Sequence, residues 1–265
     1  AGSLRTIVRR DSPDGSSWSD PPLPVVVPDW RDAHDAQCMD CGPLKHGRGY
    51  IATVPIFHGL NQMMDIQFAG SPDGRKWFRP IPRVPCVGTS ALGDCGGGHL
   101  FQSHSLVEDD GQVHLYYFAG EGLHADLYPP IDQQRNPRGQ EACHMTGGLA
   151  RATWDRGRYW AIVPSAAGPS QAVVTTFPLD DVAGKSLYIN AATIDDGQIT
   201  AELTAGAGGN FGPAVEGFTR QDSLPFRGDS KCTPLRWKKQ EQCPRDGLLL
   251  HLYIRRARLY GFEWR

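Results

Sequence analysis

Short segments of alternating apolar and polar residues, separated by turn residues, make up most of the chain. In the segment 105–120, for example, Asp110-Gly111 stands between two such alternations. Successive side chains of a strand point to opposite faces, and Asp-Gly favours the tight turn of a hairpin. We therefore predict a hairpin here, and a second one in 147–163 that turns near 155–157. No apolar stripe with helical spacing runs through three turns without meeting Gly or Pro, so the sequence predicts an all-β fold.

One turn sequence is written twice in the first third of the chain. Ser-Pro-Asp-Gly-x-x-Trp-x-x-Pro begins at Ser12 and again at Ser71. Proline presets φ and glycine accepts the positive φ that a tight turn requires, so each copy predicts a turn. Apolar segments flank both copies, and the tryptophan can pack back over the turn as the next strand begins. A strand, a turn and a second strand anchored by tryptophan are typical of the outer hairpin of a propeller blade.

The pattern changes after about Gly168, where these turns stop. Alternating segments follow, with a predicted turn at Asp196-Gly197 and a long closing strand over 247–264. These alternating segments predict a jelly-roll-like β-sandwich. We therefore expect propeller blades in 1–168 and a C-terminal sandwich in 169–265. The closing strand should bury one face, formed by Leu248, Leu250, Leu252 and Ile254.

Composition narrows the possible partners. The 265 residues carry a net charge of −2, so no overall basic field would attract nucleic acid. The best apolar run, LLLHLYI from Leu248, is far too short to span a membrane. No signal peptide is recognisable, so we take the sequence as a mature chain or a fragment. We expect no nucleic-acid partner and no membrane span.

Seven cysteines favour an oxidising compartment, either extracellular or the lumen of the secretory pathway. We predict disulfides between Cys86 and Cys95 and between Cys232 and Cys243, which leaves an odd number of cysteines. A zinc site is the competing interpretation of one segment, because its ligand types suit zinc although its spacing is shorter than that of a zinc finger. We favour no metal and no cofactor; the residues concerned are His34, Cys38, Cys41 and His46.

Several motifs, in this order along the chain, resemble one known group of proteins. They are SPDGSSWSDP, GYIATVPIFHG, DIQFAGSPDGRKWFRP, GDCGGGHLFQSHSLVEDDGQVHLYYFAGEGLH, GKSLYINAATIDDGQITAEL and LHLYIRRARLYGFEW. On these motifs the sequence is similar to the later blades and the C-terminal β-sandwich of the five-bladed propellers of glycoside hydrolase families 32 and 43. The resemblance implies that the two Ser-Pro-Asp-Gly copies mark equivalent turns in successive blades.

A blade takes about 40–60 residues, so 1–168 holds about three blades of the five that the resemblance implies. The part of the family that normally supplies much of the catalytic carboxylate set has no counterpart here. The alternatives are a partner chain that supplies the other blades, a fragment, or a fold that closes differently.

The resemblance also indicates candidate site residues. Hydrolysis of a glycosidic bond needs two carboxyl groups, one protonated and one ionised. Asp94 is the first candidate, because the glycines beside it would let a sugar approach the backbone, although an Asp beside glycines also caps turns. Glu121 and Asp65 are the other candidate acids, and Asp65 can equally be an edge residue. Three histidines are candidates for binding sugar hydroxyl groups, with solvated or core histidines as the alternative; they are His124, His99 and His58.

We therefore expect a secreted, carbohydrate-active protein that hydrolyses a glycosidic bond, with furanosides among the candidate substrates. The alternative is a non-catalytic glycan-binding or structural protein of an extracellular assembly, because similarity of fold does not imply activity. In both cases the expected partner is a glycan or polysaccharide, together with any chain that completes the propeller.

Overall fold

The computed structural model describes residues 4–127, 146–166, 170–207 and 210–265. In these residues the only helical element is the 3-10 turn η1 (His124–Leu127), and the rest of the regular structure is β-strand. The all-β class expected from the sequence is confirmed. The chain forms two compact units, 1–156 and 157–265.

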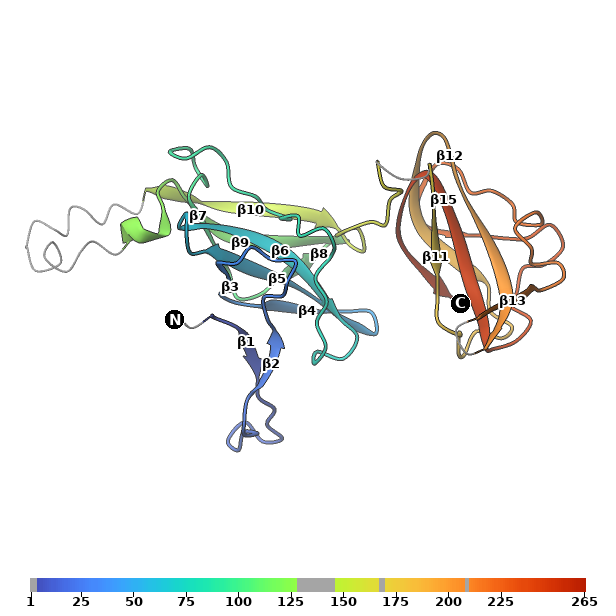
Figure 1. The fold of residues 1–265 in the computed structure, drawn as a ribbon, viewed down its shortest axis with the longest axis horizontal. Coiled ribbons are helices and arrows are strands. Elements are labelled where there is room, and N and C mark those ends of the chain that lie inside the picture. The colour runs from blue at the N-terminus through green and yellow to red at the C-terminus, as the bar shows by residue number, and fades with distance from the viewer. Residues whose placement is uncertain (1–3, 128–145, 167–169, 208–209) are drawn as a thin grey trace, which may run out of the picture. The chain divides into compact units, whose positions relative to one another are not determined.

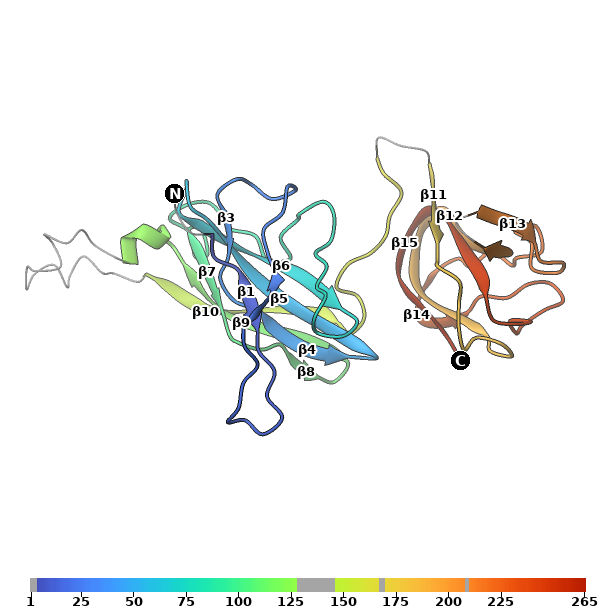
Figure 2. The same cartoon turned by 60° about the horizontal axis from the view of Figure 1, so that its bottom comes forward.

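The first unit contains two open sheets (Figure 1). The larger one has eight strands in the order β10-β9-β7-β6-β5-β3, with β4 paired to β5 and β8 to β9. The smaller one pairs β1 with β2, which Figure 1 draws below the larger sheet, and Figure 2 shows the same strands turned by 60°. The strands are β1 (Ile7–Arg9), β2 (Leu23–Val26), β3 (Ala36–Cys38), β4 (Gly42–His46), β5 (Gly49–His58), β6 (Met63–Ser71), β7 (His99–Gln102), β8 (Val107–Asp109), β9 (Gln112–Gly120) and β10 (Gly147–Asp155).

The strands of the first unit fall into three groups that follow each other in sequence. In the second group, the interrupted strand β3/β4 pairs with β5, and β5 pairs with β6. In the third group, β7 and β8 pair with β9, and β9 pairs with β10. One parallel pair, Met64 with His99, joins these two groups, while β1 and β2 form the first. This open arrangement fits the expected partial propeller of about three blades.

The two Ser-Pro-Asp-Gly copies adopt the same turn. The glycine amide donates to the serine Oγ in both, over 2.7 Å at Gly15 and 2.8 Å at Gly74. Asp14 Oδ1 accepts the amides two and three residues further on, at 2.8 and 2.7 Å, and Asp73 does the same at 2.8 and 2.9 Å. These amides lower the pKa of both carboxyl groups, to about 2 for Asp14. The first turn follows β1 and the second follows β6, as expected of equivalent positions in successive strand groups.

The second unit contains a five-stranded sheet in the order β11-β15-β12-β13, with β14 also on β12. The predicted turn at 196–197 is wrong, because β12 continues through these residues. The strand bends there instead: its register against β15 shifts between Thr193 and Gln198, and Asp195 and Arg256 have positive φ. The strands are β11 (Gln171–Thr175), β12 (Leu187–Ala207), β13 (Asn210–Ala214), β14 (Asp229–Pro234) and β15 (Leu248–Trp264).

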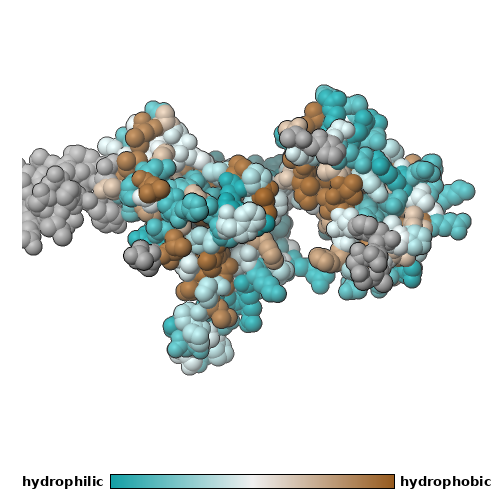
Figure 3. All heavy atoms as spheres, viewed as in Figure 1, coloured by the Kyte–Doolittle hydropathy of each residue, from teal (hydrophilic) through white to brown (hydrophobic). Residues whose placement is uncertain are grey.

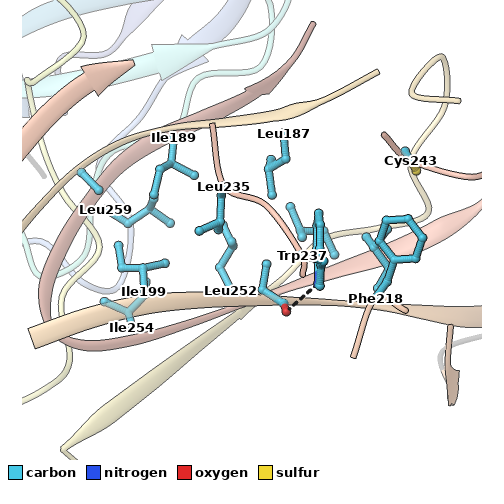
Figure 4. Packing of buried hydrophobic residues seen from close by; sticks show 14 of the residues in the cluster. Leu187, Ile189, Ile199, Phe218, Leu235, Trp237, Cys243, Leu252, Ile254 and Leu259 are labelled. Carbon is cyan, nitrogen blue, oxygen red and sulfur yellow. Dashed lines mark hydrogen bonds between the residues drawn. The ribbon is translucent and has the colours of Figure 1, made fainter. Parts of the chain in front are cut away.

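The bend makes a sandwich out of two long strands. Residues on both sides of it, such as Ile189 and Ile199, belong to one buried cluster, which Figure 4 shows from close by. Trp237 closes this core: its indole N–H donates to the carbonyl of Ala201 over 3.2 Å, and its ring meets Phe218 edge-on. The predicted buried face of the closing strand is confirmed, since its four residues, Leu248, Leu250, Leu252 and Ile254, are fully buried.

Residues after β10 do not return to pair with it, so the predicted hairpin over 147–163 is wrong. Ile162 instead forms a bridge with Leu259 of β15, in both directions between their backbones. The contacts therefore group residues from 157 onward with the second unit. The sequence pattern placed residues 157–168 with the propeller blades. The domain limits 1–168 and 169–265 stay a prediction.

The predicted disulfides are not formed. All six cysteines in the described residues are free thiols, and Cys143 lies outside them. The Cys86 thiol donates to the carbonyl of Ile66 over 3.2 Å, and Cys243 donates to the carbonyl of Arg245 over 3.2 Å. Burial raises the pKa of Cys86 to about 12. Each of these two thiols therefore contacts a backbone carbonyl and not a second sulfur. Two cysteines that flank a loop in the sequence do not pair here.

Candidate functional site

All six candidate residues lie at one end of the eight-stranded sheet, which we call the site end. Here β5 and β9 end, and β6, β7 and β10 begin. Cross-strand partners at this end run from β5 to β10, with Phe57 opposite Met64, Met64 beside His99, and His99 opposite Gly120. The topology therefore brings together residues that are distant in sequence; they are His58, Asp65, Asp94, His99, Glu121 and His124.

Asp94 and Glu121 lie on two loops that are joined to each other. The amide of Gly93 donates to the carbonyl of Glu121 over 3.2 Å, and the amide of Gly98 donates to the carbonyl of Gly120 over 3.0 Å. Asp94 is exposed and Glu121 is half-buried. Two carboxyl groups are thus carried on neighbouring backbones at the site end.

The glycines beside Asp94 allow two loops of the protein to pack closely, which is not the role that the sequence predicted. We expected them to let a sugar approach the backbone, but the protein's own backbone fills that space. A Cβ on Gly97 would lie 1.9 Å from the carbonyl oxygen of Ala91, and one on Gly98 would lie 1.6 Å from that of Gly122. These glycines therefore let the loops pack closely.

His99 and His124 lie among aromatic rings. The His99 side chain is buried, and its Nδ1 lies 2.7 Å from the carbonyl oxygen of Gly122, so Nδ1 carries the proton and donates. Its ring contacts Phe101, at 5.3 Å between centroids. The ring of His124 contacts Phe57 at 4.8 Å. Burial first, and then the neighbouring His99, lower the pKa of His124. A neutral imidazole among aromatic rings can accept a hydrogen bond from a sugar hydroxyl group.

His58 and Asp65 form an ion pair across β5 and β6. Nε2 of His58 lies 2.8 Å from Oδ2 of Asp65, and the side chains are 23% and 14% exposed. The hydrogen bond to Asp65 raises the pKa of His58. The hydrogen bond therefore favours the charged imidazolium of His58, whereas burial favours the neutral imidazole of His124.

The ion pair is the end of a longer set of polar side chains that the sequence did not predict. Oδ1 of Asp65 accepts a hydrogen bond from the side-chain Nε2 of Gln67 over 3.3 Å. Oε1 of Gln67 lies 3.4 Å from Nη1 of Arg79. Arg79 binds Asp32 with both terminal nitrogens, one of them over 2.7 Å. Arg83 then contacts Asp32 and Asp29. We call these residues the charged chain; they are His58, Asp65, Gln67, Arg79, Asp32, Arg83 and Asp29.

The charged chain runs through the interior of the first unit. The side chains of Arg79 and Asp32 are 4% and 2% exposed. Burial opposes ionisation of Asp32, but hydrogen bonds from Arg79 and from the amide of Asp29 outweigh it, and the pKa of Asp32 is lowered. The only sequence signal was the alternation of Asp65 and Gln67 along β6, which places both on one face.

The competing zinc interpretation of the segment 34–46 can be compared with the structure. Among the described residues, no group of three or more His, Cys, Asp or Glu side chains is arranged to hold a metal ion. In the same part of the chain, no helix is long and apolar enough to cross a membrane.

Comparisons with known proteins give a distant likeness in fold. No family model and no curated protein matches the sequence. A solved structure described as a glycoside hydrolase is 19% identical, with 54% of this chain and 34% of that chain covered and a TM-score of 0.37. The xylan beta-1,4-xylosidase from Bacillus halodurans C-125 is 9% identical, with 96% and 69% covered and a TM-score of 0.34.

A Bombyx mori GH32 beta-fructofuranosidase is 12% identical, with 96% of this chain and 61% of that chain covered and a TM-score of 0.31. The chain therefore spans about a third of the length of the first of these structures and well over half of the other two. All three likenesses are distant, with TM-scores of 0.37 or less.

Proposed function

We propose that this chain is a carbohydrate-active protein that binds a glycan at the site end and hydrolyses a glycosidic bond there. One observation carries the proposal: three acidic and three imidazole side chains, chosen from the sequence, gather at the same end of one sheet. Carboxyl groups supply the acid–base chemistry of glycoside hydrolysis, and aromatic rings with nearby hydrogen-bonding groups bind sugars.

In this proposal Asp94 and Glu121 are the reacting carboxyl groups. They are solvent-accessible, and the hydrogen bond between Gly93 and Glu121 holds their loops together. Asp65 is less suited to direct attack, because His58 and Gln67 already occupy both of its oxygens. His124, against Phe57, would bind a sugar hydroxyl group, whereas His99 is only 2% exposed and lies behind the surface.

A non-catalytic glycan-binding role is the second candidate function. The engagement of Asp65 favours it, because it leaves one acid fewer at the site end. Both candidates share a glycan ligand, and they differ in whether bond cleavage follows binding.

The open first unit supports a further part of the proposal, that another segment or chain covers β1 and β2. A two-stranded sheet is marginal by itself. Val8 and Leu23 on these strands are 50% and 52% exposed, and Figure 3 shows apolar side chains gathered in this region. Extracellular location also stays a prediction.

The test is release of reducing sugar from a panel of polysaccharides, with glycan binding measured in parallel by calorimetry. The proposal expects release that falls at least about 10²-fold in Asp94→Asn or Glu121→Gln, while binding persists. Binding without any release would establish the second candidate. Absence of both binding and release would refute both functions.

A further inference from the structure

We infer that His58, held by Asp65 and the charged chain behind it, is the proton donor of the site end. This inference rests on the proposed function and deepens it by assigning the acid. Hydrolysis needs one group that is protonated at the working pH and one that is ionised. The imidazolium of His58 would be the first, and the carboxylates of Asp94 and Glu121 would together supply the second.

The geometry leaves one nitrogen of His58 for this role. Nε2 is bound to Oδ2 of Asp65 at 2.8 Å, which fixes the orientation of the ring. The side chain is 23% exposed, at the last residue of β5, so it is half-buried and yet reaches solvent. Among the described residues no partner is found for Nδ1. That nitrogen can therefore carry a proton to a bound substrate.

The charged chain explains how Asp65 is held in place. Its other oxygen accepts from Gln67, whose own oxygen lies 3.4 Å from the buried Arg79 guanidinium. A buried set of ion pairs is weak evidence for stability, because well-packed apolar residues often replace one without loss. Its position behind a half-buried His–Asp pair is what positioning of a reactive group requires.

Three carboxylates face His58 from the elements packed against it. Asp65 lies on β6, and Asp35 and Asp32 lie on the segment between β2 and β3. All three raise the pKa of His58, against the effect of its burial. The charged form is therefore present below that raised pKa, and the acid function disappears as the pH rises through it.

Nδ1–H of His58 gives its proton to the glycosidic oxygen as the bond from that oxygen to the anomeric carbon breaks. The bonding electron pair stays on the departing oxygen, which leaves as a hydroxyl group. Water then supplies OH to the anomeric carbon, and the neutral imidazole regains a proton from that water, directly or through solvent. No redox partner is needed.

The experiment uses the full chain and compares His58→Gln with the matched control His104→Gln. His104 also pairs with an aspartate, with 3.0 Å between Nδ1 and Oδ2 of Asp40, but its side chain is 93% exposed. Two classes of substrate are hydrolysed by each variant: the glycan found with the panel, and a dinitrophenyl glycoside of the same sugar. The dinitrophenolate leaves without a proton, so its departure needs no acid.

The expected result for His58→Gln is a loss of about 10²–10⁴-fold in kcat on the glycan, with little change on the dinitrophenyl glycoside. The fall in activity at high pH should disappear in this variant and shift to lower pH in Asp65→Asn. His104→Gln should match the wild type on both substrates. NMR titration of the imidazole in the wild type and in Asp65→Asn should place the high-pH limb at the pKa of His58.

Three results would overturn the inference. Equal losses on both substrates would make His58 a structural residue only. An unchanged rate and pH profile on the glycan in a folded His58→Gln variant would assign the proton to another group, while the proposed function would stand. If the wild type hydrolyses nothing in the panel, the proposed hydrolysis fails, and the assignment of the acid fails with it.

Discussion

Removal of Arg79 is the sharpest test of the charged chain. Arg79→Met deletes a guanidinium whose side chain is 4% exposed. The carboxylate of Asp32, 2% exposed, then keeps Arg83 as a cationic partner only at the longer distance of 3.4 Å. Breaking a buried ion pair on one side costs about 3–5 kcal/mol, because the remaining charge has lost its partner in a region of low polarity. We expect this loss in the free energy of unfolding of the first unit.

The double variant Arg79→Met/Asp32→Leu should recover most of the loss. Replacement of both charges by apolar side chains is often nearly neutral. Asp32 also accepts the amide of Asp29 over 2.7 Å, and the loss of this bond should leave a deficit of about 1 kcal/mol. Arg10→Met is the matched control, because the Arg10–Asp20 pair is exposed on both sides and its loss should cost about 0–1 kcal/mol.

Hydrogen exchange followed by mass spectrometry reads out the two units separately. In Arg79→Met, amides of β5 and β6 should exchange about two to four orders of magnitude faster, since each 1.4 kcal/mol is a factor of ten. Amides of β12 and β15 should not change and serve as an internal reference. The reasoning is refuted if Arg79→Met costs less than about 1 kcal/mol, or if the double variant is less stable than the single one.

Four further predictions concern other parts of the molecule. Trp237→Phe leaves the buried carbonyl of Ala201 without its donor and should destabilise the second unit by about 1–3 kcal/mol in urea unfolding, with β5 and β6 unaffected. Gly98→Ala would place a Cβ 1.6 Å from the oxygen of Gly122 and should speed exchange in 93–99 and abolish glycan binding. Gly88→Ala meets only a side-chain atom, at 3.8 Å, and should do neither. Thiol titration of the denatured, unreduced chain should find at least six thiols; five or fewer would mean that disulfides form. The His58–Asp65 pair should stabilise the protein fully below the unfolded pKa of about 6.5 and lose this contribution as pH rises through the raised folded pKa; an Asp65→Asn variant with the same pH profile of stability would contradict this.

Local sequence patterns determined the strands, the repeated turns and the buried face of β15. These features depend on side-chain alternation and on the φ preferences of Pro, Asp and Gly, which act within a few residues. The copies at Ser12 and Ser71 form the same hydrogen bonds because the same side chains recur at the same spacing. The candidate acids and histidines could likewise be chosen from motifs, before any distance between them was known.

Only the tertiary structure decided how these pieces meet. Asp196-Gly197 has the composition of a turn, yet pairing with β15 carries β12 through it as a bend. Arg79 and Asp32 are far apart in sequence, and nothing in either segment marks them as a buried pair. The cysteines show the same limit, because a covalent bond depends on the approach of two side chains and not on spacing alone. Sequence patterns act over short range, whereas pairing partners, burial and charge neighbours are set by contacts between distant segments, and the pairing of His58 with Asp65 is one of these contacts.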